Sequence, residues 1–162
     1  MLKVALLMIS IQNFLDCSDL LPMVAGRVHA QWFVNKPGHT VEGMLQRMLT
    51  SRRAEIPIGL VAFVDGVPAG TISLLESDLD ERQDLRPWVA GLLVFPNFRN
   101  QGVGSALLQA LMDIGTIIGI VNMYLYTDKP DFYERFGWIK LCKAESYAGC
   151  YVMSYRRAPA TF

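Results

Sequence analysis

The sequence predicts an α/β fold, a single domain over residues 1–162 in which a mixed, mainly antiparallel sheet is flanked by helices. Strand-like and helix-like segments alternate along the chain, and no internal repeat interrupts them. Residues 58–75 have the pattern of a β-hairpin, since two apolar runs flank Asp65-Gly66, a pair that suits a type I′ turn. A glycine-containing loop then separates a strand-like run at residues 88–95 from a long helix-like run.

The N-terminal region is predicted to contain one strand followed by helices. Residues 3–8 are mostly apolar and are expected to form the first strand, because no small-residue cleavage pattern follows that would make them a signal peptide. Residues 11–33 have helical spacing of apolar residues that is interrupted at Pro22, which predicts two short helices or one broken helix. Thr40 is expected to begin a further helix.

The C-terminal half is predicted to alternate between helices and strands. A helix at residues 102–118 follows the glycine loop, and Gly115 and Gly119 argue against reading this apolar region as a membrane span. The remaining elements are a strand at 121–127, a short helix at 131–136 and strands at 138–143 and 150–156. This order predicts a sheet with helices on both faces.

Charge and cysteine content exclude several classes of function. The formal net charge is zero, so no positive field exists to hold nucleic acid or an anionic membrane, and small molecules or other proteins are the expected partners. Three cysteines without a C-x-x-C pair are too few for a disulfide framework, which favours a reducing, cytoplasmic location. His29 and His39 have no metal-ligand spacing, so no metal is expected.

The most informative stretch is the loop at residues 99–105, Arg-Asn-Gln-Gly-Val-Gly-Ser. Gly102 and Gly104 allow backbone angles and close approaches that other residues do not, so amide groups at the start of the helix can converge on a phosphate. A nucleotide-like diphosphate is therefore the expected ligand. The loop lacks the Lys-Ser/Thr ending of a P-loop and the third glycine of a dinucleotide fingerprint, so both of those classes fit poorly.

The spacing Arg99-x-x-Gly102-x-Gly104 resembles the R/Q-x-x-G-x-G/A signature of the GCN5-related N-acetyltransferase (GNAT) family, whose loop holds the pyrophosphate of coenzyme A. Residues 132–138, Phe-Tyr-Glu-Arg-Phe-Gly-Trp, resemble the family's second signature. The resemblance covers residues 57–156 and implies a GNAT-like acyl-CoA N-acyltransferase domain that uses acetyl-CoA. The cofactor-binding residues it implies are Leu92, Leu93, Val94, Arg99, Asn100, Gln101, Gly102, Val103, Gly104 and Ser105.

An exposed strand edge at residues 92–94 can pair with the amide-containing pantetheine arm of coenzyme A as if that arm were another strand. In the family this edge opens because a bulge separates the cofactor strand from the next strand, and Ala90-Gly91 is the expected place for the bulge. The other interpretation of Gly91 is that it only relieves packing. Amide groups near Leu93 or Val94 are expected to polarise the acetyl carbonyl.

Acetyl transfer from a thioester to an amine also needs a proton for the departing thiolate and a neutral amine. The resemblance places Tyr133 beside the coenzyme sulfur as the proton donor. Residues 88–95 contain no carboxylate, although many relatives carry one there. Glu76, which ends a predicted strand and follows apolar residues, is therefore the expected general base through partial desolvation, and Asp78, a water chain or no dedicated base are the alternatives.

The acceptor pocket is expected to involve Trp32 and Trp88, although each tryptophan also fits a place in the core. The acidic connection at residues 76–86 weakly favours a cationic acceptor. The predicted function is acetyl-CoA-dependent transfer to a small primary amine by direct attack in a ternary complex. The alternatives are a noncatalytic acyl-CoA-binding sensor module and a protein or peptide N-terminal acetyltransferase, and the late strands are compatible with a homodimer.

Overall fold

Seven strands form one open sheet in the order β1-β2-β3-β4-β5-β7-β6 in the computed structural model, which describes residues 6–158. All neighbouring strands are antiparallel except β4 and β5, which are parallel, so the predicted mixed and mainly antiparallel sheet is confirmed. The strands are β1 (Ile9–Asn13), β2 (Ile58–Val64), β3 (Val67–Leu75), β4 (Trp88–Val94), β5 (Asn122–Thr127), β6 (Ile139–Lys143) and β7 (Tyr151–Arg156).

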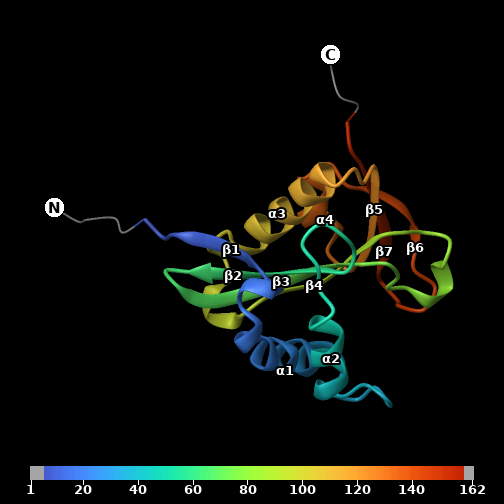
Figure 1. Cartoon of the computed structure of the whole chain (residues 1–162). Helices are drawn as coiled ribbons and strands as arrows, with labels where there is room; N and C mark the ends of the chain where they lie inside the picture. The colour runs from blue at the N-terminus through green and yellow to red at the C-terminus, as the bar shows by residue number, and fades with distance from the viewer. Residues whose placement is uncertain (1–5, 159–162) are drawn as a thin grey trace.

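Helices cover both faces of the sheet (Figure 1). They are α1 (Leu21–Trp32), α2 (Val41–Met48), α3 (Val103–Ile117) and α4 (Pro130–Glu134). On one face α1 and α2 bury Val24, Val28 and Met44 against β2 and β4, while α3 packs Leu107 and Leu111 on the opposite face. The sheet is therefore the middle layer of three, and all seven residues of β2 are buried between the helical layers.

The first strand lies later in the chain than predicted. Strand β1 begins at Ile9 and pairs antiparallel with β2 as far as Asn13, so the expected strand at residues 3–8 is wrong for residues 6–8, and residues 3–5 lie outside the described part of the chain. The predicted helix also starts too early, since residues 11–13 belong to β1. Pro22 lies in the first turn of α1, where a missing N–H costs nothing, and so starts the helix instead of breaking it.

Local signals elsewhere are confirmed. Asp65 and Gly66 have φ angles of 49° and 81°, as a type I′ turn requires between β2 and β3. The Thr40 hydroxyl accepts a hydrogen bond of 3.0 Å from the Gly43 amide and so caps α2. Within residues 6–158 no helix has the length and apolar character needed to cross a bilayer.

Candidate active site

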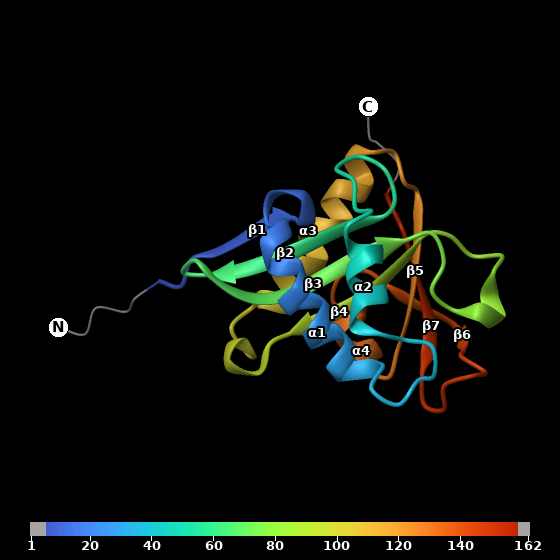
Figure 2. The same ribbon diagram turned by 60° about the horizontal axis from the view of Figure 1, so that its bottom comes forward.

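Strand β4, the strand expected to contact the cofactor, contains a bulge and then separates from β5. Thr71 of β3 pairs with Leu93, and Ser73 pairs with Ala90, so two residues, Gly91 and Leu92, lie opposite one residue of β3. Gly91 has a φ of +63°, a conformation that favours glycine, and the predicted bulge is confirmed there. Strands β4 and β5 pair only through Trp88 and Tyr124, so a gap opens between them beyond that point (Figure 2).

The gap leaves peptide groups of β4 without a strand partner. The Phe95 amide donates to the Ala69 carbonyl at 2.8 Å, which turns the backbone of Phe95 toward β3. Because backbone groups alternate in direction along a strand, those of Val94 face the gap and those of Leu93 face β3. The Val94 carbonyl accepts a hydrogen bond of 3.4 Å from Nε of Arg99. The open edge therefore presents the backbone of Val94, while Leu93 contributes its side chain to the neighbouring hollow.

The glycine loop forms an anion cradle at the start of α3. Asn100 and Gly102 have φ angles of 59° and 83°, and Gly102 provides no side-chain cap for the helix. The first amides of α3, from Val103 onward, therefore lack helical acceptors and point out of the helix. A Cβ on Gly104 would lie 3.4 Å from Val94 and 3.6 Å from Phe132, so a side chain there would enter the space between loop, strand and α4. The cradle has the free backbone donors that a diphosphate requires.

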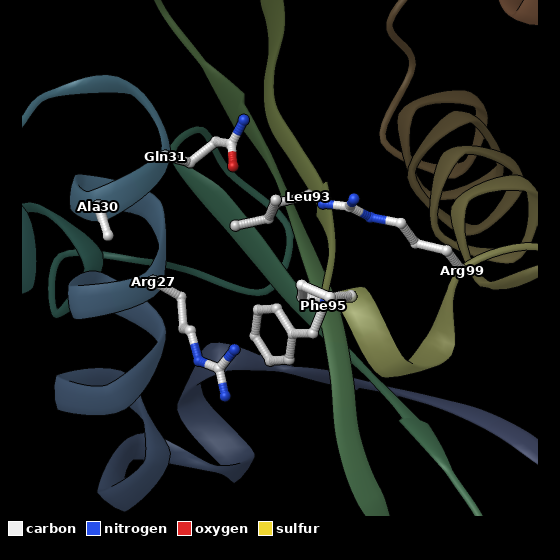
Figure 3. A pocket seen from close by; sticks show the side chains of 7 residues that line it. Arg27, Ala30, Gln31, Leu93, Phe95 and Arg99 are labelled. Carbon is white, nitrogen blue, oxygen red and sulfur yellow. The ribbon is translucent and has the colours of Figure 1, made fainter.

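A hollow of about 180 Å³ lies between α1 and the C-terminal end of β4. Figure 3 shows Arg27 extending from α1 and Arg99 extending from the loop toward β4. The Arg27 guanidinium lies 4.9 Å from the centre of the Phe95 ring, and neither arginine has a carboxylate partner among residues 6–158. Sequence reasoning identified Arg99 but missed Arg27 and Gln31, because only tertiary packing brings α1 to this edge.

Tyr133 lies half-buried on α4 among aromatic rings. Its ring meets Phe132 edge-on at 5.0 Å and Trp138 at 6.2 Å between centroids. Burial, with a smaller contribution from the Asp128 carboxylate, raises the pKa of Tyr133 to about 12. The phenol is therefore protonated at neutral pH and can donate a hydrogen bond.

The two candidate bases have different environments. The side chain of Glu76 is 62 % exposed and its Oε1 lies 3.1 Å from Nη1 of Arg86, so the expected desolvation of Glu76 is not found. Asp78 is half-buried, and burial raises its pKa to about 6, although the charge of Lys36 partly opposes that rise. Of the two candidate bases, Asp78, the alternative to Glu76 in the sequence analysis, is therefore the one whose pKa is raised by burial.

The two tryptophans expected near the acceptor also differ. Trp88 is 0 % exposed and its indole N–H donates to the Leu85 carbonyl at 2.6 Å, so its expected contact with an acceptor is corrected to a place in the core. It packs there against Tyr124 and Tyr126. Trp32 is 40 % exposed at the end of α1 and remains accessible to a ligand.

Cysteines and metal ligands add little to the site. Burial and the Asp128 carboxylate raise the pKa of the Cys150 thiol, and burial raises that of Cys17. All three cysteines are free. In the described part of the chain no group of three or more His, Cys, Asp or Glu side chains is placed to hold a metal ion.

A sheet opened between two parallel strands, beside a helix whose first amides are free, defines a site for an acyl carrier with a diphosphate. The profile of the Acetyltransferase (GNAT) family matches residues 28–138. The chain therefore belongs to the GNAT family of acetyltransferases, as both motifs indicated. No curated protein matches the chain.

Solved structures share this fold. An aminoglycoside 6′-N-acetyltransferase complexed with coenzyme A has a TM-score of 0.71 at 14% identity, covering 94% of this chain and 99% of that chain. Ard1 from Thermoplasma volcanium has a TM-score of 0.67 at 20% identity, covering 93% and 99%. PaiA N-acetyltransferase from Thermoplasma acidophilum, in complex with coenzyme A, has a TM-score of 0.65 at 17% identity, covering 93% and 99%. At these identities the similarity shows the fold alone.

Proposed function

We propose that the protein is an acetyl-CoA-dependent N-acetyltransferase that acts on a primary amine of a small molecule by direct attack in a ternary complex. The observation that carries this proposal is the free amide cradle of α3 beside the open edge of β4. Two similar structures that contain coenzyme A, one of them an aminoglycoside acetyltransferase, support the cofactor and the small-molecule acceptor.

The cofactor is held by backbone more than by side chains. In the proposal, loop residues Arg99 to Ser105 surround the diphosphate, and the peptide groups of Leu92 and Val94 pair with the pantetheine arm. Arg27 and Arg99 supply positive charge beside the same edge. Because most of these contacts come from amides, they depend on the loop conformation that Gly102 allows.

When bound, acetyl-CoA supplies a thioester whose acetyl carbon can accept an amine nitrogen. Asp78 accepts the proton that the acceptor must lose, since a carboxylate with a pKa of about 6 is ionised at neutral pH and still basic enough for this task. Tyr133 donates a hydrogen bond where negative charge develops on sulfur, and its raised pKa keeps it protonated.

Direct transfer is favoured over a covalent enzyme intermediate. A cysteine nucleophile acts as a thiolate, and burial together with Asp128 raises the pKa of Cys150 and so keeps its thiol protonated. The free cysteines are also compatible with the reducing cytoplasm expected from the sequence.

The test is a panel of amines with acetyl-CoA in which the released thiol is measured. Small primary amines, aminoglycosides, amino acids and short peptides each form one arm. Turnover of a small amine supports the proposal, while turnover of peptides alone would make the protein a peptide N-terminal acetyltransferase. A silent panel combined with tight binding of coenzyme A would overturn catalysis and favour the sensor module.

A further inference from the structure

Lys36, in the connection between α1 and α2, places its ammonium group against two aromatic rings. Nζ of Lys36 lies 5.0 Å from the centre of the Phe33 ring and 5.3 Å from that of Tyr147. The same nitrogen donates to the Tyr147 hydroxyl at 3.3 Å. Lys36 is half-buried, which is unusual for a lysine on a loop. These contacts define an ammonium seat, made by Phe33, Tyr147 and the charge of Asp78.

Four separate segments hold the seat in place. Phe33 stacks on His39 at 5.0 Å, and Tyr147 stacks on Tyr126 of β5 at 5.0 Å. The carboxylate of Glu81 accepts hydrogen bonds of 2.7 and 2.8 Å from the amides of Glu145 and Ser146, which fixes the turn that carries Tyr147. The connections after α1 and after β6 meet here (Figure 2). The seat is therefore part of the fold and not a chance contact of one exposed lysine.

The seat adjoins the gap between β4 and β5. Tyr126 lies two residues beyond Tyr124, the last residue of β5 that pairs with β4, and it packs against Trp88. Asp78, whose charge interacts with both Lys36 and Tyr126, lies beside it. The proposed base and the seat thus lie next to the residues at which β4 and β5 separate.

A nitrogen held over aromatic faces is stabilised as a cation, and a protonated nitrogen has no lone pair for attack on a thioester. An acceptor that uses the seat therefore needs two nitrogens, one retained as ammonium and one that reacts. We propose that the seat binds one ammonium group of a diamine acceptor, and that the ammonium of Lys36 occupies the seat until the acceptor displaces it. This inference rests on the proposed function, because it names the substrate class of that reaction.

Kinetics with a matched pair of amines test the proposal. We expect 1,4-diaminobutane to be acetylated with a kcat/KM at least about tenfold higher than 1-aminobutane, since one ammonium contact separates the two. Lys36→Met empties the seat and should lower the ratio of the diamine KM to the monoamine KM several-fold, because a change in the charge environment of Asp78 acts on both amines alike. Lys36→Arg keeps a cation in the seat and should leave the diamine KM near the wild-type value. Lys143→Met, at an exposed lysine of β6, is the matched control.

Two results would contradict the proposal that the seat binds a diamine. The first is an equal kcat/KM for 1,4-diaminobutane and 1-aminobutane. The second is a ratio of diamine KM to monoamine KM that is unchanged or raised in Lys36→Met. Calorimetric binding of 1,4-diaminobutane without acetyl-CoA separates this proposal from the proposed function. If no amine is acetylated but Lys36→Met binds the diamine more tightly than wild type, the seat stands and the transferase proposal fails. If neither protein binds it, the seat is wrong whatever the activity.

Discussion

At the scale of single residues, the site depends on groups whose protonation is set by burial. Burial raises the pKa of Tyr133, whose phenol is protonated at neutral pH, and it also makes Asp78 more basic than an exposed aspartate. Each environment suits the role proposed for the residue, a donor to sulfur and an acceptor of a proton. Both roles can be separated from cofactor binding, because neither side chain belongs to the amide cradle.

Tyr133→Phe should lower kcat by about 10²-fold or more while the affinity for coenzyme A stays near the wild-type value. The substitution removes only the hydroxyl and keeps the ring that packs against Phe132 and Trp138. Steady-state kinetics with saturating amine, together with calorimetric titration of coenzyme A, measure both effects. Full turnover by the variant would exclude Tyr133 as the donor.

Asp78→Asn should remove the fall in kcat/KM that wild type shows at acidic pH. In wild type, kcat/KM is expected to rise with pH through about 6, because Asp78 must be ionised to accept a proton and Lys36, Asp80 and Tyr126 set its charge environment. The variant should lose about 10²-fold or more of the rate on the plateau. Glu76→Gln, at the exposed carboxylate paired with Arg86, is the matched control and should keep the fall at acidic pH.

The same aspartate should make the protein less stable at neutral pH. Its pKa of about 6 in the folded protein lies above the 3.8 of a free aspartate, so its stabilising contribution is complete below about pH 4 and is lost as the pH rises through 6. We therefore expect Asp78→Asn to be more stable than wild type by about 1–3 kcal/mol at pH 8, with no gain from this source at pH 3.5. Urea unfolding at both pH values measures the difference, and an equal effect at both would contradict this origin.

At the scale of elements, two glycines show how backbone conformation builds the site. Gly102 and Gly119 flank α3 with φ angles of +83° and +87°. Gly102→Glu should reduce coenzyme A affinity about 10²-fold or more, because it adds a negative charge to the loop whose amides form the anion cradle. Gly119→Glu carries similar backbone strain at the other end of the helix and should keep the affinity. Calorimetric titration compares the two, and equal losses would mean that strain and not the cradle was being measured.

Strand β2 and the turn after β1 depend on another glycine. A Cβ on Gly59 would overlap the buried ring of Phe14, whereas nothing lies within 4 Å of a Cβ on Gly26 in α1. Gly59→Ala should therefore lower the free energy of unfolding by about 1–3 kcal/mol. Gly26→Ala should raise it by about 0.5–1 kcal/mol through helix propensity. Urea denaturation checks both, and a neutral Gly59→Ala would show that Phe14 can move without cost.

At the scale of the whole molecule, a ligand in the gap should join two parts of the sheet that meet through one residue pair, Trp88 and Tyr124. Coenzyme A at about 100 times its Kd should add about 2.7 kcal/mol to the unfolding free energy. For a domain of this size that corresponds to a rise in Tm of about 5–10 °C. Thermal unfolding measures the rise, and Gly102→Glu should lack it.

Much of the fold follows from local patterns, since the hairpin turn at Asp65-Gly66 and the loop around Gly102 have conformations that their own residues determine. The start of β1 could not be found in this way, because the apolar run is longer than the part that pairs with β2. The burial of Asp78 relative to Glu76 was equally hidden. The charge that partly opposes the effect of this burial comes from Lys36, on a connection far away in the sequence, and Tyr147, which contacts that lysine, is 111 positions from it.

The position of β7 has a consequence for how the chain is assembled. Strand β7 lies between β5 and β6, although it follows both in the sequence. During synthesis, β6 therefore emerges from the ribosome before the strand that will connect it to the rest of the sheet. Until Arg156 has been translated, β5 has an unpaired edge and β6 has no sheet neighbour. The region that carries Tyr147 should thus be the last to fold, and a nascent chain stalled before this point should be open to proteolysis there.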